Sequence, residues 1–381
     1  MMGKKVLIVF GTRPEAIKMA PLVIRLLKDK SFETRVCVTA QHREMLDMVL
    51  ELFQLVPDYD LDLMSAGQSI TDITTRVLTG MEEILIKERP DLVLVHGDTT
   101  TTMAAALSAF YQKVDVGHVE AGLRSGNIYS PYPEEMNRRI TGTLAKLHFA
   151  PTIGNKENLL AGGVSEDNIF VTGNTVIDAL HMVVEGEYVF PVPLLNNLDY
   201  INRRVILLTA HRRENWGAGM QNIFRAVRKI VEKNLDTELI YPVHLNPRVK
   251  DDAYKLLSGL ARIHLIPPLD YAPFANLMAR SHLVLTDSGG IQEEAPALGK
   301  PVLVLRTETE RPEAVEAGTV KVIGVEEERI VQEAQLLLDS SAAYEEMARA
   351  VNPYGDGRAS ERIVKALIKK PFRLNRCPLS G

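Results

Sequence analysis

The chain has 381 residues, of which 46% are hydrophobic and 24% charged, a composition that excludes a disordered or fibrous protein. This length exceeds what one hydrophobic core usually organises, so two domains are expected. Lys and Arg (44) are outnumbered by Asp and Glu (49) and are scattered along the chain, so no nucleic-acid-binding surface is predicted.

Short Val, Ile and Leu runs alternate with amphipathic stretches, the pattern of a parallel sheet covered by helices. Strands are predicted at residues 6–10, 36–39, 92–95 and 116–119, with helices at 17–27 and 103–111. A second set of strands is predicted at 205–208, 239–241, 263–266, 283–285 and 302–305. The fold class is therefore α/β, with two doubly wound halves.

A Pro-containing segment at 185–204 with few helical signals separates the two sets of strands. We place the hinge between Thr172 and Arg204, which gives an N-terminal domain at 1–172 and a C-terminal domain at 173–359. The C-terminal helix within 360–381 is expected to pack back on the first domain.

The two cysteines, Cys37 and Cys377, cannot build a disulfide framework, and Cys37 lies in an apolar run that predicts a buried strand. The apolar run near the N-terminus is too short for a signal peptide core or a membrane span. No later stretch reaches about 18 uninterrupted apolar residues. We therefore expect a cytoplasmic protein with no membrane partner.

Ligands of open parallel sheets bind at the carboxyl ends of the strands, so the residues that directly follow each apolar run are the functional candidates. The segments at these positions are Gly11-Thr12-Arg13-Pro14-Glu15, His96-Gly97-Asp98-Thr99, Glu120-Ala121-Gly122-Leu123-Arg124, His211-Arg212-Arg213-Glu214-Asn215 and Asp287-Ser288-Gly289-Gly290. The sequence lacks G-x-G-x-x-G after the first predicted strand, so no bound nicotinamide cofactor is predicted. It also lacks G-x-x-x-x-G-K-[ST], so no P-loop ATPase is predicted. The His and Cys residues show no metal-binding spacing.

The turn Ser288-Gly289-Gly290 joins a predicted strand to a predicted helix, whose free N–H groups could bind a phosphate. A tight turn in which Ser288 caps the helix is equally compatible with the sequence. Arg13 and Lys18 flank the first turn of another predicted helix, where cations oppose the helix dipole and therefore favour an anionic ligand. For Lys18, a solvated surface charge is the alternative.

Asp98 and Glu120 follow strands that we expect to be neighbours, and two like charges in one crevice favour acid/base chemistry. Capping of the following helix is an alternative role for Asp98. Glu134 stands at a predicted helix start, where Glu is common without any function. His211 follows a strand and is flanked by cations, which favours a role towards a phosphate over a structural one.

At these same residues the chain resembles the non-hydrolysing UDP-N-acetylglucosamine 2-epimerases over nearly its whole length. The motifs that carry the resemblance are Gly11-Thr12-Arg13-Pro14-Glu15-Ala16, His96-Gly97-Asp98-Thr99, His118-Val119-Glu120-Ala121-Gly122-Leu123-Arg124, Pro133-Glu134-Glu135-Met136-Asn137-Arg138-Arg139, Thr209-Ala210-His211-Arg212-Arg213-Glu214-Asn215 and Asp287-Ser288-Gly289-Gly290-Ile291-Gln292-Glu293-Glu294. Each motif alone is weak, but their order and spacing together are specific.

The resemblance implies two Rossmann-like domains with a cleft between them, a glycosyltransferase-B-like fold that needs no nicotinamide cofactor and no catalytic metal. The catalytic residues that it implies are Asp98, Glu120, Glu134 and His211. The UDP-sugar contacts that it implies are Arg13, Lys18, His211, Phe274, Ser288, Gly289, Gly290, Glu294 and Arg311.

The implied reaction is the reversible conversion of UDP-N-acetylglucosamine into UDP-N-acetylmannosamine. The C2 proton is not next to a carbonyl, so its removal requires elimination of UDP through 2-acetamidoglucal, followed by re-addition. Glu120 or Glu134 would remove the proton with the help of Asp98. His211, Arg13 and the glycine turn would stabilise the departing UDP.

Bacterial relatives also suggest a homodimer and activation by a second UDP-N-acetylglucosamine beside the active site. The residues that resemble this regulatory site include Gln41, His42, Arg212 and His244, although Glu44 stands where some members have Gln.

Four alternatives remain open. The substrate could be a C3-modified UDP-sugar, or the protein could be a retaining UDP-sugar glycosyltransferase, which shares the fold but would have little use for three carboxylates. A hydrolysing relative would release UDP and free N-acetylmannosamine. A non-catalytic sensor could lose Asp98, Glu120 or His211, yet all three are present.

Overall fold

The computed structural model describes residues 3–40, 43–63, 65 and 67–370. These residues form two compact units, one that runs to Met182 and resumes at Tyr354, and one at Val183–Pro353. The first unit thus extends beyond residue 172, and its end at Met182 lies in the range between Thr172 and Arg204 in which the sequence placed the hinge. The reason is local, because Asp178 accepts hydrogen bonds from the backbone N–H groups of Ala359 (3.0 Å) and Ser360 (2.8 Å).

The first unit is built on a parallel sheet in which the described residues form seven strands in the order β3-β2-β1-β4-β5-β6-β7. The strands are β1 (Lys4–Phe10), β2 (Phe32–Val38), β3 (Tyr59–Asp60), β4 (Leu92–His96), β5 (Asp115–Val119), β6 (Leu147–Ala150) and β7 (Ile169–Val171). The helices are α1 (Arg13–Lys28), α2 (Arg43–Leu52), α3 (Ile70–Glu88), α4 (Thr100–Tyr111), α5 (Glu134–Leu144), α6 (Ile153–Ala161), the 3-10 turn η1 (Glu166–Asn168), α7 (Thr175–Val183) and α16 (Ala359–Lys369).

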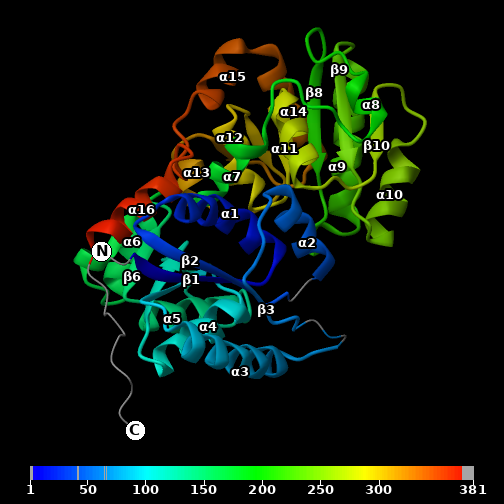
Figure 1. Cartoon of the computed structure of the whole chain (residues 1–381). Coiled ribbons are helices and arrows are strands. Elements are labelled where there is room, and N and C mark those ends of the chain that lie inside the picture. Colours follow the sequence, from blue (N-terminus) through cyan, green and yellow to red (C-terminus); the bar gives the residue numbers. More distant parts are fainter. Residues whose placement is uncertain (1–2, 41–42, 64, 66, 371–381) are drawn as a thin grey trace. The chain divides into compact units, whose positions relative to one another are not determined.

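Helices cover both faces of this sheet (Figure 1), and α1 shows why the sequence folds in this way. Met19, Leu22, Val23 and Leu26 recur at helical spacing and are each completely buried. Burial of each such side chain stabilises the fold by about 1.5–3 kcal/mol relative to exposure. α16 packs along α1, while α3, α4 and α5 lie together on the other face.

The second unit repeats this architecture with the strand order β10-β9-β8-β11-β12-β13, again with parallel pairs throughout. Its strands are β8 (Arg204–Thr209), β9 (Thr237–Pro242), β10 (Ile263–Ile266), β11 (Leu283–Thr286), β12 (Val302–Val304) and β13 (Val320–Val322). Its helices are α8 (Pro193–Asn196), the 3-10 turn η2 (Arg213–Asn215), α9 (Ala218–Lys233), α10 (Pro247–Leu257), α11 (Tyr271–Arg280), α12 (Ile291–Ala297), α13 (Pro312–Glu316), α14 (Glu327–Asp339) and α15 (Ser341–Ala348).

In both sheets the strand order reverses direction beside the first strand, between β1 and β4 and between β8 and β11. Loops that leave the carboxyl ends of such strands diverge and leave room for a ligand. The predicted functional segments after β1, β4, β8 and β11 therefore lie at the switch points of their sheets. Among the described residues, no helix is both long and apolar enough to cross a membrane.

Candidate active site

The loop between β1 and α1 is fixed by a buried carboxylate. Thr12 caps α1, and Glu15 accepts hydrogen bonds from the backbone N–H groups of Gly11 (3.0 Å) and Thr12 (2.8 Å). The other oxygen of Glu15 accepts from the hydroxyls of Thr99 (2.6 Å) and Thr102 (2.9 Å) at the start of α4. Because Glu15 is only 2% exposed, this set of donors replaces the water that the carboxylate has lost. The switch point of the first sheet is thus preorganised.

Two predicted substrate contacts lie in the first turns of α1. Arg13 is the first residue of α1, and its guanidinium makes no ion pair with the described residues. Lys18 instead turns towards β5, where its ammonium lies 2.5 Å from Oε2 of Glu120. The side chain of Lys18 is 17% exposed, so its interpretation as a solvated surface charge is wrong.

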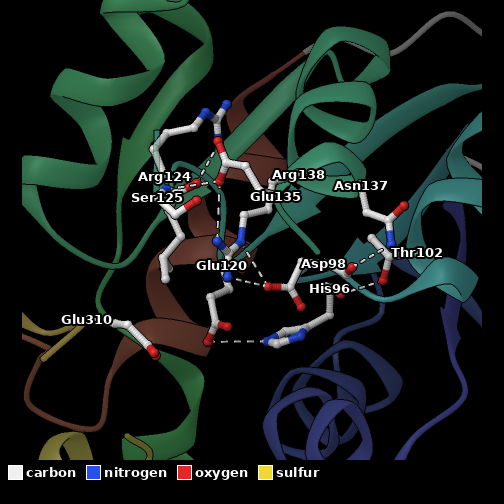
Figure 2. Close-up of polar contacts among 12 residues, drawn as sticks. His96, Asp98, Thr102, Glu120, Arg124, Ser125, Glu135, Asn137, Arg138 and Glu310 are labelled. Carbon is white, nitrogen blue, oxygen red and sulfur yellow. Dashed lines mark hydrogen bonds and ion pairs between the residues drawn. The ribbon is translucent and has the colours of Figure 1, made fainter. Parts of the chain in front are cut away.

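Glu120 follows β5 with a φ of 60°, in the left-handed region that costs a non-glycine residue about 1–2 kcal/mol. The backbone conformation directs its side chain to a polar cluster in the same unit. Oε2 accepts a hydrogen bond from Asn174 (2.8 Å) in addition to the Lys18 ammonium, and Nε2 of His96 lies 3.7 Å away (Figure 2). Burial lowers the pKa of His96, although the negative charge of Glu120 opposes this effect.

Asp98 is held from α5. Arg138 donates to Oδ2 of Asp98 from Nε (2.9 Å), and its Nη2 forms an ion pair with the same oxygen at 2.7 Å. Asn137 donates to the backbone carbonyl of Asp98 (2.9 Å). Figure 2 shows these groups beside Glu120 and His96. Thr99, and not Asp98, caps α4, so the capping interpretation of Asp98 is wrong. The prediction that Asp98 and Glu120 follow neighbouring strands is confirmed, because β4 pairs with β5.

Glu134 is the first residue of α5, as the sequence predicted. Its Oε2 is shielded from solvent and has no hydrogen-bond partner among the described residues. The adjacent Glu135 is fully buried and accepts from the backbone N–H of Ser125 (3.0 Å) and from Arg139 (3.0 Å). Burial opposes ionisation of Glu135, but these donors lower its pKa. Glu135 therefore anchors α5 and leaves Glu134 as the available carboxylate.

In the second unit, Asp287 joins the ends of β8 and β11. It is completely buried, and its Oδ2 accepts from the backbone N–H groups of His211 and Arg212, both at 2.8 Å. Its Oδ1 lies 3.3 Å from Nδ1 of His211. Burial lowers the pKa of His211, whereas the Asp287 carboxylate raises it. The position after β8 therefore carries an imidazole oriented by a carboxylate.

Residues predicted for catalysis and for regulation are contiguous in this unit. The ring of His211 stacks on the ring of His244 with 5.4 Å between centroids. Nη1 of Arg212 lies 3.9 Å from Glu310, and a Cβ placed on Gly289 would be 3.8 Å from Nη2 of Arg212. The other two predicted regulatory residues, Gln41 and His42, lie outside the described residues.

The glycine turn after β11 leads directly into α12. No side chain caps α12, so the interpretation of Ser288 as a helix cap is wrong. A Cβ on Gly290 would meet no atom within 4 Å, and one on Gly289 would meet only the ends of flexible side chains. Gly290 is exposed and Ser288 half-buried, whereas Gly289 is buried, so the turn is open at its Gly290 end, where the sequence predicts a phosphate.

The other UDP contacts predicted in this unit lie before and after the turn in the sequence, and they differ in burial and in their partners. Arg311 forms a hydrogen-bonded ion pair with Glu293, which is buried. Phe274 is half-buried in α11, and Glu294 is half-buried in α12. Burial and the charge of Glu294 raise the pKa of Tyr271 well above its ordinary value.

Sequence reasoning missed the residues that hold the predicted ones in place. His96, Glu135, Arg138 and Asp287 lie inside the recognised motifs, so their proximity to the candidate residues was a usable signal. Asn174 lies outside every motif, and only the fold brings it to Glu120. Over residues 3–40, 43–63, 65 and 67–370, no group of His, Cys, Asp or Glu side chains could hold a metal ion.

A family model, sequence relatives and solved structures all match this chain to the same family. The family model described as UDP-N-acetylglucosamine 2-epimerase matches residues 25–368. The UDP-N-acetylglucosamine 2-epimerase of Salmonella typhimurium is 55% identical over 380 residues, which cover 97% of this chain and 100% of the relative.

Solved structures agree with the sequence relatives. The UDP-GlcNAc 2-epimerase of Neisseria meningitidis bound to UDP-GlcNAc superposes with a TM-score of 0.86 at 52% identity, covering 96% of this chain and all of the other. An S. aureus protein solved with UDP has a TM-score of 0.86 at 50% identity and covers 97% and 99% of the two chains. The two parallel sheets with flanking helices thus match the glycosyltransferase-B-like fold of known epimerases.

Proposed function

Because the chain belongs to the UDP-N-acetylglucosamine 2-epimerase family, we propose that it interconverts UDP-N-acetylglucosamine and UDP-N-acetylmannosamine by elimination and re-addition of UDP. The observation that supports this chemistry best is the set of carboxylates in the first unit. Glu120 is paired with an ammonium, Asp98 with a guanidinium, and Glu134 has a shielded oxygen without a hydrogen-bond partner in the described part of the chain. Carboxylates in such different settings can take different roles in proton transfer.

The reaction must break the C2–H bond without an adjacent carbonyl to stabilise a carbanion. In the proposed elimination, a carboxylate takes the C2 proton, the C–H electrons form the C1–C2 double bond, and the C1–O bond breaks. UDP leaves with that electron pair, and 2-acetamidoglucal remains. In the return step UDP attacks C1 while a proton reaches C2 from the opposite face.

Two proton-transfer groups on different faces of the sugar are therefore required, and we assign them to Glu120 and Glu134. The ion pair with Lys18 favours the charged form of Glu120, which suits a base. Asp98 assists, held by Arg138. General acid/base groups of this kind typically contribute about 10²–10⁴-fold to a rate.

Departure of UDP places negative charge on a phosphate oxygen, and the second unit supplies groups for that charge. We assign this role to the turn at Ser288, Gly289 and Gly290, whose last residue is exposed, and to His211. Burial lowers the pKa of His211, and the Asp287 carboxylate opposes this effect and so favours the imidazolium form. The remaining proposed UDP contacts are Arg13, Lys18, Phe274, Glu294 and Arg311.

The purified protein incubated with UDP-N-acetylglucosamine in deuterated water, with no added nucleotide cofactor, tests the proposal. We expect UDP-N-acetylmannosamine with deuterium at C2 to form, and NMR measures both the product and its deuterium content. Substrate carrying ¹⁸O in the C1–O bridge should also lose the label to non-bridging phosphate positions, because only C–O cleavage frees that oxygen. Deuterium uptake without ¹⁸O scrambling would contradict elimination, and Glu120→Gln provides the inactive control.

Regulation and assembly form a separate part of the proposal. We propose that the protein is a homodimer and that UDP-N-acetylglucosamine activates it through the exposed His244 and through Arg212. A cooperative dependence of the reverse reaction on added UDP-N-acetylglucosamine is expected, and His244→Ala should weaken it. A strictly hyperbolic response of the native protein would remove this part alone.

A further inference from the structure

His96 is a buried residue whose polar atoms have no ordinary structural explanation. It ends β4, it is 3% exposed, and neither ring nitrogen has a hydrogen-bond partner among the described residues. An unsatisfied buried polar group costs about 1–3 kcal/mol, and most buried polar groups in proteins are paired. A Leu or Phe at this position would avoid that cost, so packing alone does not account for the imidazole.

Two other buried histidines of the same sheet show the ordinary arrangement. His118 on β5 places Nε2 2.7 Å from the carbonyl oxygen of Gly97. His148 on β6 is also buried, and a hydrogen bond with the backbone of Ala145 opposes the lowering of its pKa by burial. In each of these two residues only Nδ1 is buried without a partner among the described residues. Neither forms an ion-pair contact with a carboxylate among the described residues. His96 differs from both, because its Nε2 faces Oε2 of Glu120.

The distance between these two atoms, 3.7 Å, is too long for a hydrogen bond and short enough for a small side-chain movement to make one. Oε2 of Glu120 already accepts from Lys18 and Asn174. Lys18 is also a proposed contact of the anionic substrate. If the diphosphate draws the ammonium away, the carboxylate loses its main counter-charge, and His96 is the neighbouring donor that can replace it.

The surroundings of His96 favour a neutral imidazole in this role. The charged and titratable groups that face it are Lys18 and Glu15 from α1, Asp98 after β4, His118 from β5, and Glu120 itself. Burial is the largest influence and lowers the pKa of His96. A neutral imidazole with its proton on Nε2 can donate to a carboxylate without surrendering that proton to it.

We propose that His96 is a positioning residue for Glu120, and that in the substrate complex its neutral imidazole donates from Nε2 to the Glu120 carboxylate and keeps it ionised and aimed at the sugar. The proposal rests on the assignment of Glu120 as a proton-transfer group. The unpartnered ring nitrogens of His96 destabilise the free protein, and this destabilisation is then explained by the need for a hydrogen-bond donor in the substrate complex.

Substitution of His96 by Leu and by Gln tests this role. Leu removes the donor and fills the space, whereas Gln restores an N–H near the position of Nε2. For His96→Leu we expect kcat to fall about 10- to 100-fold, part of the usual contribution of a proton-transfer group. The acidic limb of the kcat profile, which reports the substrate complex, should move to higher pH, because a carboxylate that loses a donor protonates more readily. His96→Gln should recover most of both changes.

His148→Leu is the matched control, because it removes a buried imidazole from the same sheet away from Glu120. We expect it to leave kcat and the acidic limb unchanged. The thermal stability of His96→Leu should be equal to or above that of the native protein, since two unpartnered polar atoms are removed. Native activity with His96→Leu, or lost activity with an unmoved limb and lower stability, would overturn the proposal.

A readout without turnover separates this proposal from the proposed function. The carboxyl ¹³C signal of Glu120, assigned by its loss in Glu120→Gln, can be titrated in the presence of UDP for native protein and His96→Leu. A midpoint that moves up in His96→Leu supports the positioning role even if the native protein fails to epimerise the sugar. An unchanged midpoint contradicts it even if the native protein is an active epimerase.

Discussion

Replacement of Asp287 by Asn tests whether the buried carboxylate acts through His211. Asn keeps an oxygen for the backbone N–H groups of His211 and Arg212 but removes the charge 3.3 Å from Nδ1. Two unit charges at that separation attract by about 5 kcal/mol at an effective dielectric of about 20, and by about 1 kcal/mol in water. The His211 side chain is 39% exposed, so we take about 2 kcal/mol, which is roughly a 30-fold effect.

The expected result is a kcat at least about 30-fold lower, because the imidazolium that receives the departing phosphate loses its counter-charge. The sign of the pH dependence follows from the same argument. Asp287 raises the pKa of His211, so its removal lowers that pKa, and the alkaline limb of the kcat profile should move to lower pH. An Asn N–H directed at Nδ1 would also favour the opposite tautomer.

Steady-state epimerisation from pH 5.5 to 9.5, together with a melting curve, is the assay. Asp236→Asn is the control, since Asp236 pairs with Arg204 (2.7 Å) in the same unit and has no contact with His211. An alkaline limb that stays in place while kcat falls would mean that Asp287 only supports the loop. Native kcat in Asp287→Asn would refute the coupling altogether.

Three further predictions concern the first unit. Arg138→Lys should lower kcat about tenfold, because an ammonium cannot reproduce both the Nε hydrogen bond and the Nη2 ion pair with Oδ2 of Asp98; single-turnover rates check this. Gly11→Ala should destabilise the protein by about 1–3 kcal/mol, because its Cβ would be 1.9 Å from Oγ1 of Thr39, and a second change, Thr39→Ala, should recover most of the loss in urea unfolding. Burial lowers the pKa of His148 to about 4, below its value of about 6.5 in the unfolded chain. The unfolded chain therefore binds a proton first as the pH falls below 6.5, and the free energy of unfolding should be about 2 kcal/mol lower at pH 5 than above pH 6.5. His148→Leu removes this titration, so its urea midpoint should change less between pH 7 and pH 5 than that of the native protein.

The strands that the sequence predicted are all present. Most of them lie inside their sheets, where apolar runs are buried on both faces, although β10 lies at an edge. β3, β6, β7 and β13 were not predicted. β3 has two residues, β7 and β13 have three, and β6 contains His148 within four residues. Such short strands lie towards the sheet edges and depend on pairing with a neighbour, which periodicity does not reveal.

The positions of the candidate groups followed from topology, but their partners did not. Asp98 and Glu120 could be placed together because each directly follows a strand. The partner of Glu120, Asn174, is 54 residues away in the sequence and lies in a loop before α7. Arg138 contacts Asp98 because it lies one helical turn after Glu134, on the same helix α5. These contacts depend on how loops and helices pack, for which one sequence holds no local pattern.

In each unit a buried carboxylate holds together the two segments at the switch point of the sheet, but it comes from a different side of the switch point in each unit. In the first unit Glu15 comes from the first turn of α1, the helix after β1, and reaches Thr99 and Thr102 after β4. In the second unit Asp287 comes after β11 and reaches back to the backbone N–H groups after β8. A carboxylate buried with several donors is costly to disturb, so the functional loop that it holds is rigid before any substrate arrives. The substitution of either carboxylate should therefore impair catalysis more than the stability of its sheet, since the strands keep their own backbone hydrogen bonds.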